Sequence, residues 1–105
     1  MNSLTFDKSF HNSKIFFSKR ELNKILSCYY VWVSRGNWKD YAINVNNYEV
    51  NFLMFKHSLA APDCVLTKKK KIKKNKFFFN LDFGNKKKND FKRIEDLLII
   101  LRRNF

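Results

Sequence analysis

The sequence has few glycines and prolines. Its 105 residues include 2 Gly and 1 Pro. Gly36 and Gly84 are too few and too far apart to build a glycine-rich loop that wraps a phosphate. The nucleotide-binding motifs that depend on such loops are therefore excluded, and we expect no cofactor.

Cysteine is also scarce. Cys28 and Cys64 are separated by 36 positions in the sequence. We expect both to be reduced thiols, as is usual in proteins that stay inside the cell. Together with His11 and His57 they form no pair at the spacing of a zinc site, so no metal site is expected.

Long hydrophobic runs are absent. The longest aliphatic run, residues 97–101, is far shorter than the roughly 20 residues that cross a bilayer. Residues 1–14 are polar and lack the apolar stretch of roughly 7–15 residues that a secretory signal contains. The sequence therefore predicts a cytoplasmic protein with no membrane partner.

The chain is nevertheless rich enough in apolar residues to fold. Hydrophobic residues make up 45% and aromatic residues 17% of the sequence, which is sufficient for one core in a chain of this length. Residues 1–15 show no clear periodicity and are expected to form a flexible tail. Residues 16–105 are expected to form a single α+β domain.

The first predicted element is a helix over residues 18–35. Ser18 and Glu21 fit a capping box, and Gly36 fits the position after a helix end. Apolar residues recur at helical spacing and predict a core-facing stripe: Leu22, Ile25, Leu26, Tyr29 and Val33, with Tyr30 and Trp32 at its margins.

Alternation with a period of two then predicts strands at residues 40–45, 50–55, 64–67, 77–83 and 86–91. Asn46 and Asn47 predict a tight primed turn in the first hairpin, whose base (Trp38, Tyr41 and Ile43) should pack on the helix. A second helix over residues 94–103 should bury Ile94, Leu97, Leu98 and Leu101. The predicted architecture is an N-terminal helix, an antiparallel β-meander of about five strands and a C-terminal helix.

Positive charge dominates and is concentrated in one region. Lys and Arg number 22 against 9 Asp and Glu, a net charge of +13, of which +10 lies in residues 68–105. Two blocks hold the excess and are candidate polyanion-binding residues: Lys68, Lys69, Lys70, Lys71, Lys73, Lys74 and Lys76, then Lys86, Lys87, Lys88, Lys92 and Arg93. The alternative is that both are solvated loops in a sequence whose Lys, Asn and Phe content reflects AT-rich codons.

Aromatic residues stand directly beside the first lysine block. Phe77 and Phe79 alternate with Phe78 in the predicted strand, so we expect Phe77 and Phe79 in the core. Phe78 would then face outward, where a ring can stack on a nucleic-acid base.

No residue combination specifies a reaction, and we expect no enzymatic activity. A catalytic role for Trp38, Asp40 and Tyr41 is the least favoured hypothesis. The favoured one is a small non-enzymatic binding or accessory domain with an unknown protein partner. The alternative is a sequence-nonspecific nucleic-acid-binding protein that uses lysine-rich loops around a β-sheet. The oligomeric state stays open.

Several segments resemble one known family. Glu21-Leu22 with Ile25-Leu26, then residues 36–44 (GNWKDYAIN) and 52–56 (FLMFK), are similar in order and spacing to bacterial domain-of-unknown-function family 2794. The specific part is residues 36–44, with the family-motif residues Gly36, Trp38, Lys39, Asp40 and Tyr41, although Lys39 stands where the family has arginine. The resemblance spans residues 16–103 and implies a bacterial cytosolic protein, but it implies no catalytic residues.

Overall fold

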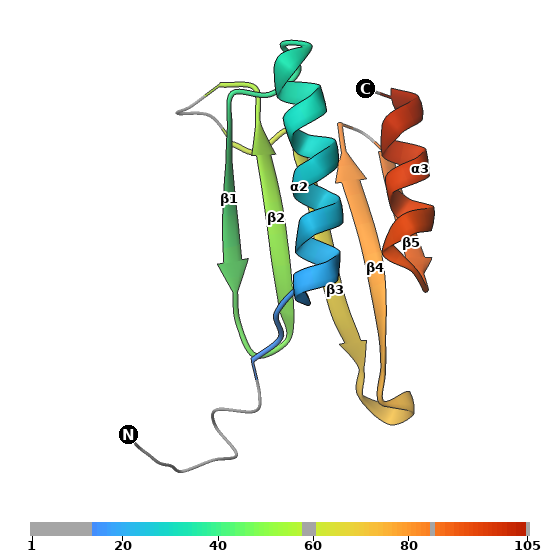
Figure 1. The fold of residues 1–105 in the computed structure, drawn as a ribbon. Coiled ribbons are helices and arrows are strands. Elements are labelled where there is room, and N and C mark those ends of the chain that lie inside the picture. Colours follow the sequence, from blue (N-terminus) through green and yellow to red (C-terminus); the bar gives the residue numbers. More distant parts are fainter. Residues whose placement is uncertain (1–13, 58–60, 85, 105) are drawn as a thin grey trace.

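The chain forms a five-stranded antiparallel sheet with two helices on one face (Figure 1). The computed structural model describes residues 14–57, 61–84 and 86–104. In chain order the elements are α2 (Lys19–Ser34), β1 (Asp40–Val45), β2 (Glu49–Phe55), β3 (Cys64–Lys71), η1 (Ile72–Lys74), β4 (Lys76–Phe83), β5 (Lys86–Phe91) and α3 (Ile94–Asn104). The strands are neighbours in sequence order, so the predicted α+β meander between two helices is confirmed.

The limits of α2 follow from its capping residues. The Glu21 N–H donates to the Ser18 hydroxyl at 3.1 Å, and the Ser18 N–H donates to the Glu21 carboxylate at 2.8 Å. Gly36 follows the helix with φ +81°, a left-handed conformation that glycine adopts without strain. The predicted capping box and stop are therefore confirmed.

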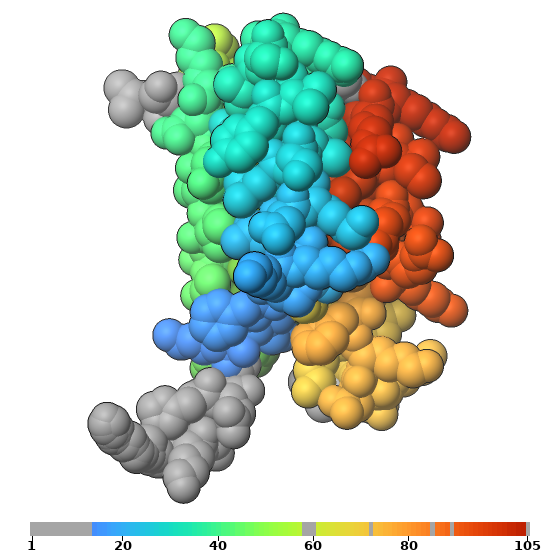
Figure 2. Space-filling model, in the orientation of Figure 1, coloured from blue at the N-terminus to red at the C-terminus, as the bar shows by residue number. Residues whose placement is uncertain are grey.

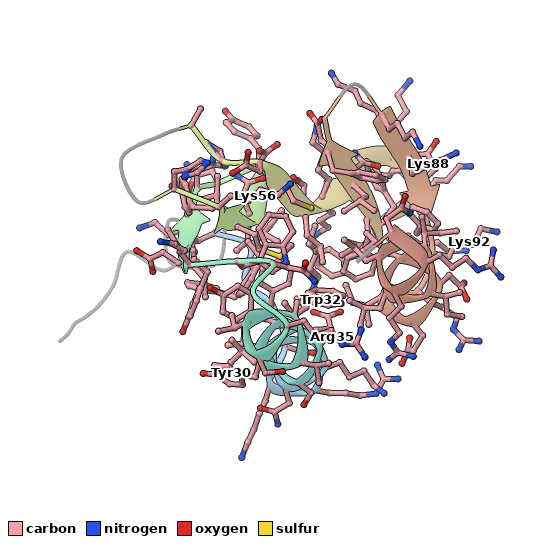
Figure 3. The ribbon with its side chains drawn as sticks, turned by 90° about the horizontal axis from the view of Figure 1, so that it is seen from above. Tyr30, Trp32, Arg35, Lys56, Lys88 and Lys92 are labelled. Atoms are coloured by element: carbon pink, nitrogen blue, oxygen red, sulfur yellow. The ribbon has the colours of Figure 1, made fainter. Side chains whose placement is uncertain are left out.

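The buried stripe of α2 differs from the prediction at one position. Trp32 is buried and Val33 is exposed, the reverse of the expectation. Trp32 stands four residues after Cys28 and three after Tyr29, both buried, so it lies at the centre of the core-facing stripe. Figure 3 shows its ring directed from α2 toward the sheet.

The turn of the β1–β2 hairpin also differs from the prediction. The Asn46 N–H donates to the Glu49 carbonyl at 3.1 Å, so the two central turn residues are Asn47 and Tyr48. Neither has a positive φ, so the predicted primed turn is wrong. The Asn46 side-chain oxygen instead accepts from the N–H groups of Tyr48 and Glu49 at 2.8 and 3.0 Å, an Asx turn.

The core fills the space between the sheet and the helices. Trp38 is 2% exposed in the core cluster that includes the buried residues of α2, and the Tyr41 ring meets that of Tyr29 of α2 edge-on with centroids 5.1 Å apart, so the predicted packing of the hairpin base on the helix is confirmed for both. Ile43 is 42% exposed, and its predicted burial is wrong. It lies on the edge strand β1, which runs beside α2 rather than beneath it (Figure 1).

Helix α3 covers the β4–β5 side of the sheet and runs in the same direction as α2 (Figure 1). Its predicted core residues, Ile94, Leu97, Leu98 and Leu101, are all buried, as expected. Ion pairs from Arg20 and Lys24 to Glu95 join the first two turns of α2 to the first turn of α3. No helix in the described part of the chain is long and apolar enough to cross a membrane.

The first lysine block is not the loop that the sequence predicted. Strand β3 continues to Lys71, and Lys68 pairs with Val50 on one side and with Phe79 on the other. Backbone pairing with two neighbouring strands keeps this segment extended although lysine has a low preference for strands. Lys73 and Lys74 lie in η1, and Asn75, with φ +50°, completes the turn into β4.

The predicted tail lies mostly outside the described residues, which begin at Lys14. Ile15 is buried, and its N–H donates to the Asn46 carbonyl at 3.3 Å. This predicted tail residue therefore packs against the turn of the β1–β2 hairpin.

Candidate polyanion-binding site

The β3–β4 hairpin extends beyond the helices at one end of the molecule. In Figure 1 the strands continue below the first turn of α2, and in Figure 2 the same segment projects as a separate bulge beneath the helices. We call this region the cationic end and define it by its exposed lysines: Lys70, Lys71, Lys73, Lys74, Lys76 and Lys92. Here six of the predicted polyanion-binding residues share one part of the surface.

A groove of about 490 Å³ lies at the cationic end. It is lined by lysines, phenylalanines and two carboxylates: Lys71, Lys74, Lys76, Lys92, Phe77, Phe78, Phe79, Glu21 and Asp90. Both carboxylates face a lysine, since Glu21 lies 2.8 Å from Lys68 and Asp90 lies 3.9 Å from Lys71. Among the described residues, no ion pair engages Lys74, Lys76 or Lys92, and their positive charge is available to a ligand.

Lys68 is a buried residue that stabilises the fold, and it does not belong to the exposed lysine surface. It is 6% exposed, and its ammonium donates to the Glu21 carboxylate at 2.8 Å and to the Phe16 carbonyl at 3.0 Å. The ammonium also lies 4.4 Å from the centroid of the Phe77 ring. A lysine held by these contacts is not available to an external anion, so we remove Lys68 from the candidate set.

Lys69 and Lys87 lie on the face of the sheet opposite the helices. They line a groove of about 560 Å³ together with Glu49, Asp82 and Asp90. Lys69 lies 3.6 Å from Glu49, whose carboxylate also accepts a hydrogen bond from Asn51 at 3.0 Å. Because three carboxylates offset the two lysines, this groove does not favour a polyanion.

The two lysine blocks do not form one patch. Lys76 is the first residue of the eight-residue strand β4, and Lys86 of β5 pairs with its last residue, Phe83, so the two lysines lie about 24 Å apart at roughly 3.4 Å per residue. Lys92 of the second block reaches the groove of the cationic end, and Figure 3 shows Lys88 and Lys92 extending outward on the β5 side. Arg93 is exposed and lies 3.7 Å from Glu95, next to the start of α3.

The three phenylalanines of the groove differ in how far they are exposed to solvent. Phe79 is buried, as predicted, but Phe77 is 46% exposed, and its predicted core position is wrong. Phe77 is the second residue of β4, at the end of the β3–β4 hairpin that extends below the first turn of α2 (Figure 1). Phe78 is half-buried on the opposite face, with the Lys71 ammonium 4.9 Å from its ring centroid.

The family motif forms the connection between α2 and β1. Gly36 ends the helix, Trp38 is buried in the core, and the Lys39 N–H donates to the Phe55 carbonyl at 2.8 Å. The Asp40 carboxylate accepts from the Tyr41 N–H at 2.8 Å, and the Tyr41 ring stacks on Phe52. These contacts explain the motif as part of the fold.

Both cysteines are free and buried. Burial, reinforced by the charges of Asp82 and Asp63, raises the pKa of the Cys64 thiol to about 12. This thiol is therefore protonated at neutral pH and is a poor nucleophile. Within the described ranges, no three His, Cys, Asp or Glu side chains are grouped to hold a metal ion.

A family model matches most of the chain. The model of a family described as Protein of unknown function (DUF2794) matches residues 15–101, which confirms the resemblance identified in the sequence. No curated protein and no solved structure matches the chain.

Proposed function

The chain belongs to the DUF2794 family of proteins of unknown function, and we propose that it is a small non-enzymatic binding domain whose ligand is a nucleic acid. The observation that carries the proposal is the cationic end. Six exposed lysines gather there around a groove lined with phenylalanine rings. Lysine ammonium groups bind phosphates as point charges, and aromatic rings stack on bases.

The distribution of charge supports this site over the rest of the surface. The groove on the open face of the sheet contains carboxylates that match its lysines, whereas Lys74, Lys76 and Lys92 have no acidic partner among the described residues. Unpaired lysines on a projecting hairpin attract phosphates over distances of about a Debye length, roughly 8 Å at 0.15 M salt. We place this activity in the cytosol, where free thiols such as Cys28 and Cys64 are maintained.

The test is the salt dependence of binding to single-stranded DNA or RNA. We expect binding at about 0.15 M salt, weakening with salt at a log–log slope of about −0.7 per phosphate contacted. The variant Lys73→Gln/Lys74→Gln/Lys76→Gln should lose up to three contacts, so its slope should be shallower by up to about 2. These lysines are exposed, and their replacement should leave the melting temperature unchanged.

A matched control variant distinguishes the effect of the cationic end from the effect of the total charge of the protein. Lys39, Lys56 and Lys86 are exposed lysines at the opposite end of the sheet, where Lys39 precedes β1, Lys56 follows β2 and Lys86 pairs with Phe83. Lys39→Gln/Lys56→Gln/Lys86→Gln removes the same charge and should keep the wild-type slope. The proposal fails if both triple variants change the slope equally, or if the wild-type protein shows no binding at about 0.15 M salt.

A protein ligand is the second candidate, favoured by a groove between the two helices. This groove has a volume of about 520 Å³ and is lined by Val31, Trp32, Arg35 and Arg102. Figure 3 shows Arg35 on the α3-facing side of α2. An acidic protein bound there would be retained from lysate after nuclease treatment and lost with Arg35→Glu/Arg102→Glu, whereas retention through nucleic acid would be lost with nuclease.

A further inference from the structure

Phe77 lies at an unpaired edge of the sheet. Strand β4 pairs with β5 from Phe79 onward, where Phe79 is opposite Phe91. Its first residues, Lys76, Phe77 and Phe78, extend past the end of β5 and pair with β3 alone. The groove of the cationic end opens along this edge, so a ligand can approach the backbone and the Phe77 ring together.

The Phe77 ring is held in place by cations. The Lys68 ammonium lies 4.4 Å and the Lys70 ammonium 6.0 Å from its centroid. Lys68 is fixed by Glu21 and by the Phe16 carbonyl, so the ring packs against a stationary charge. The residue is nevertheless 46% exposed, and the exposed part of its side chain is available for stacking.

The positions of the carboxylates determine which part of a nucleotide enters the groove. Glu21 and Asp90 line it, each facing a lysine (Lys68 and Lys71), so a phosphate is attracted less strongly beside these neutralised pairs than beside Lys74, Lys76 and Lys92. A base carries no charge, and its N–H groups can donate to carboxylate oxygens. Lys73, Lys74 and Lys76 are exposed around the turn outside β3, where flanking phosphates can reach them.

From this geometry we infer that the ligand is single-stranded and that one of its bases stacks on Phe77 inside the groove, with the adjacent phosphates on the surrounding lysines. The inference rests on the proposed function and specifies its ligand. A volume of about 490 Å³ falls within the roughly 300–1,000 Å³ of ordinary ligand sites. In a duplex the bases are already stacked and paired, so they cannot enter such a groove without unpairing.

The experiment compares two probes of equal charge. One is an oligothymidylate of about 12 nucleotides, and the other is an abasic strand with the same number of phosphates. Affinities are measured by fluorescence anisotropy at about 0.15 M salt, where loose attraction is screened. We expect the wild-type protein to bind the oligothymidylate about tenfold more tightly, since one base–aromatic stack contributes that much.

Variants at Phe77 connect the preference to the ring. Phe77→Leu should bring the two affinities within about twofold by weakening binding of the oligothymidylate alone, while Phe77→Tyr should restore the preference because it restores a ring. The control Tyr30→Leu removes another exposed aromatic, 58% exposed on α2 and directed away from the sheet (Figure 3), and should change neither affinity. Thermal unfolding of each variant checks that the fold is intact.

The outcomes distinguish the inference from the proposed function. Equal wild-type affinity for the two probes overturns the inference and leaves phosphate binding in place. A tenfold preference that survives in Phe77→Leu overturns the role of Phe77. The absence of binding to either probe overturns the proposed function itself.

Discussion

The two halves of the β3–β4 hairpin share one pattern of alternation but differ in what covers them. In the half beneath the helices, Leu66 pairs with Leu81 and Cys64 with Phe83, and all four are buried. In the other half, Lys70 pairs with Phe77 on the same face, and both are exposed. The comparison teaches that helix cover, rather than strand alternation, sets the limit of this core.

The boundary between the halves lies at one cross-strand pair. Lys68 and Phe79 are opposite each other and both buried. The charge of Lys68 is balanced by Glu21 in the first turn of α2, where the helix cover begins. On the helix-facing side of the hairpin, the pair Lys68–Phe79 is therefore buried, and the next pair on that face, Lys70–Phe77, is exposed.

The largest predicted effect compares a covered residue and an uncovered residue of strand β4. Leu81→Ala should destabilise the protein by about 2–5 kcal/mol, because it leaves a cavity beneath the helices. Phe77→Ala, four residues earlier on the same face, should cost far less, since the ring is already half in solvent. The measurement is the free energy of unfolding by urea.

Similar losses in these two variants would contradict the comparison, because they would show that the cationic end contributes to the core. Leu81→Met is a suitable control, since it keeps most of the volume and should cost less than about 1.5 kcal/mol.

The second predicted effect distinguishes neighbouring lysines. Lys68→Gln removes the partner of a half-buried carboxylate and should cost about 1–3 kcal/mol. Lys70→Gln removes an exposed ammonium and should stay within about 0.5 kcal/mol of the wild-type value. Both variants lose one positive charge, so the difference between their free energies of unfolding reports the position of the lysine rather than the charge removed. Equal values would mean that Lys68 is as solvated as Lys70.

Much of the fold could be predicted because its signals are local. The capping box at Ser18 and Glu21 and the stop at Gly36 depend on residues within a few positions of one another. The apolar stripe of α3 likewise follows from spacing within one helix. Such features are independent of how the elements later pack.

The errors at the lysine block and at Phe77 arise where tertiary contacts decide. The lysine block reads as a loop, but pairing with β2 and β4 makes its first part a strand. The alternation of residues in β4 predicts that Phe77 is buried in the core, because it carries no information on where the helices end. The groove was missed for the same reason, since it combines Lys92 with residues of β3 and β4. One sequence signal for the groove was available. Asn75 favours a turn between Lys70 and Phe77, and such a turn places these two residues opposite each other at the end of a hairpin.

The third predicted effect concerns the helix start at the boundary. Ser18→Ala should cost about 1 kcal/mol, because it removes the acceptor of the Glu21 N–H. Ser18→Asp should restore most of this loss, since an aspartate carboxylate also caps a helix. Chemical unfolding of both variants provides the measurement. A loss within about 0.5 kcal/mol, the scatter of surface substitutions, would mean that the cap does not stabilise the boundary.

The smallest predicted effect concerns Glu95, at the first turn of the other helix. A hydrogen bond from its own backbone N–H lowers the pKa of this carboxyl, desolvation opposes it, and the charges of Arg20, Lys24 and Arg93 lower it further. A carboxyl with a lowered pKa in the folded state stabilises the protein above its unfolded pKa, about 4.3, and loses that contribution as pH falls through the folded value.

Glu95→Gln should therefore be slightly less stable than the wild-type protein at neutral pH, and the difference should shrink as the pH falls below about 4.3. The measurement is the difference in urea unfolding between the two proteins from neutral to acidic pH. Raising the salt at neutral pH should reduce the same difference, because the three cationic partners are at least partly exposed. A difference that is constant with pH would show that Glu95 acts through neutral packing, and the ion pairs that join the helices above the cationic end would then contribute nothing to stability.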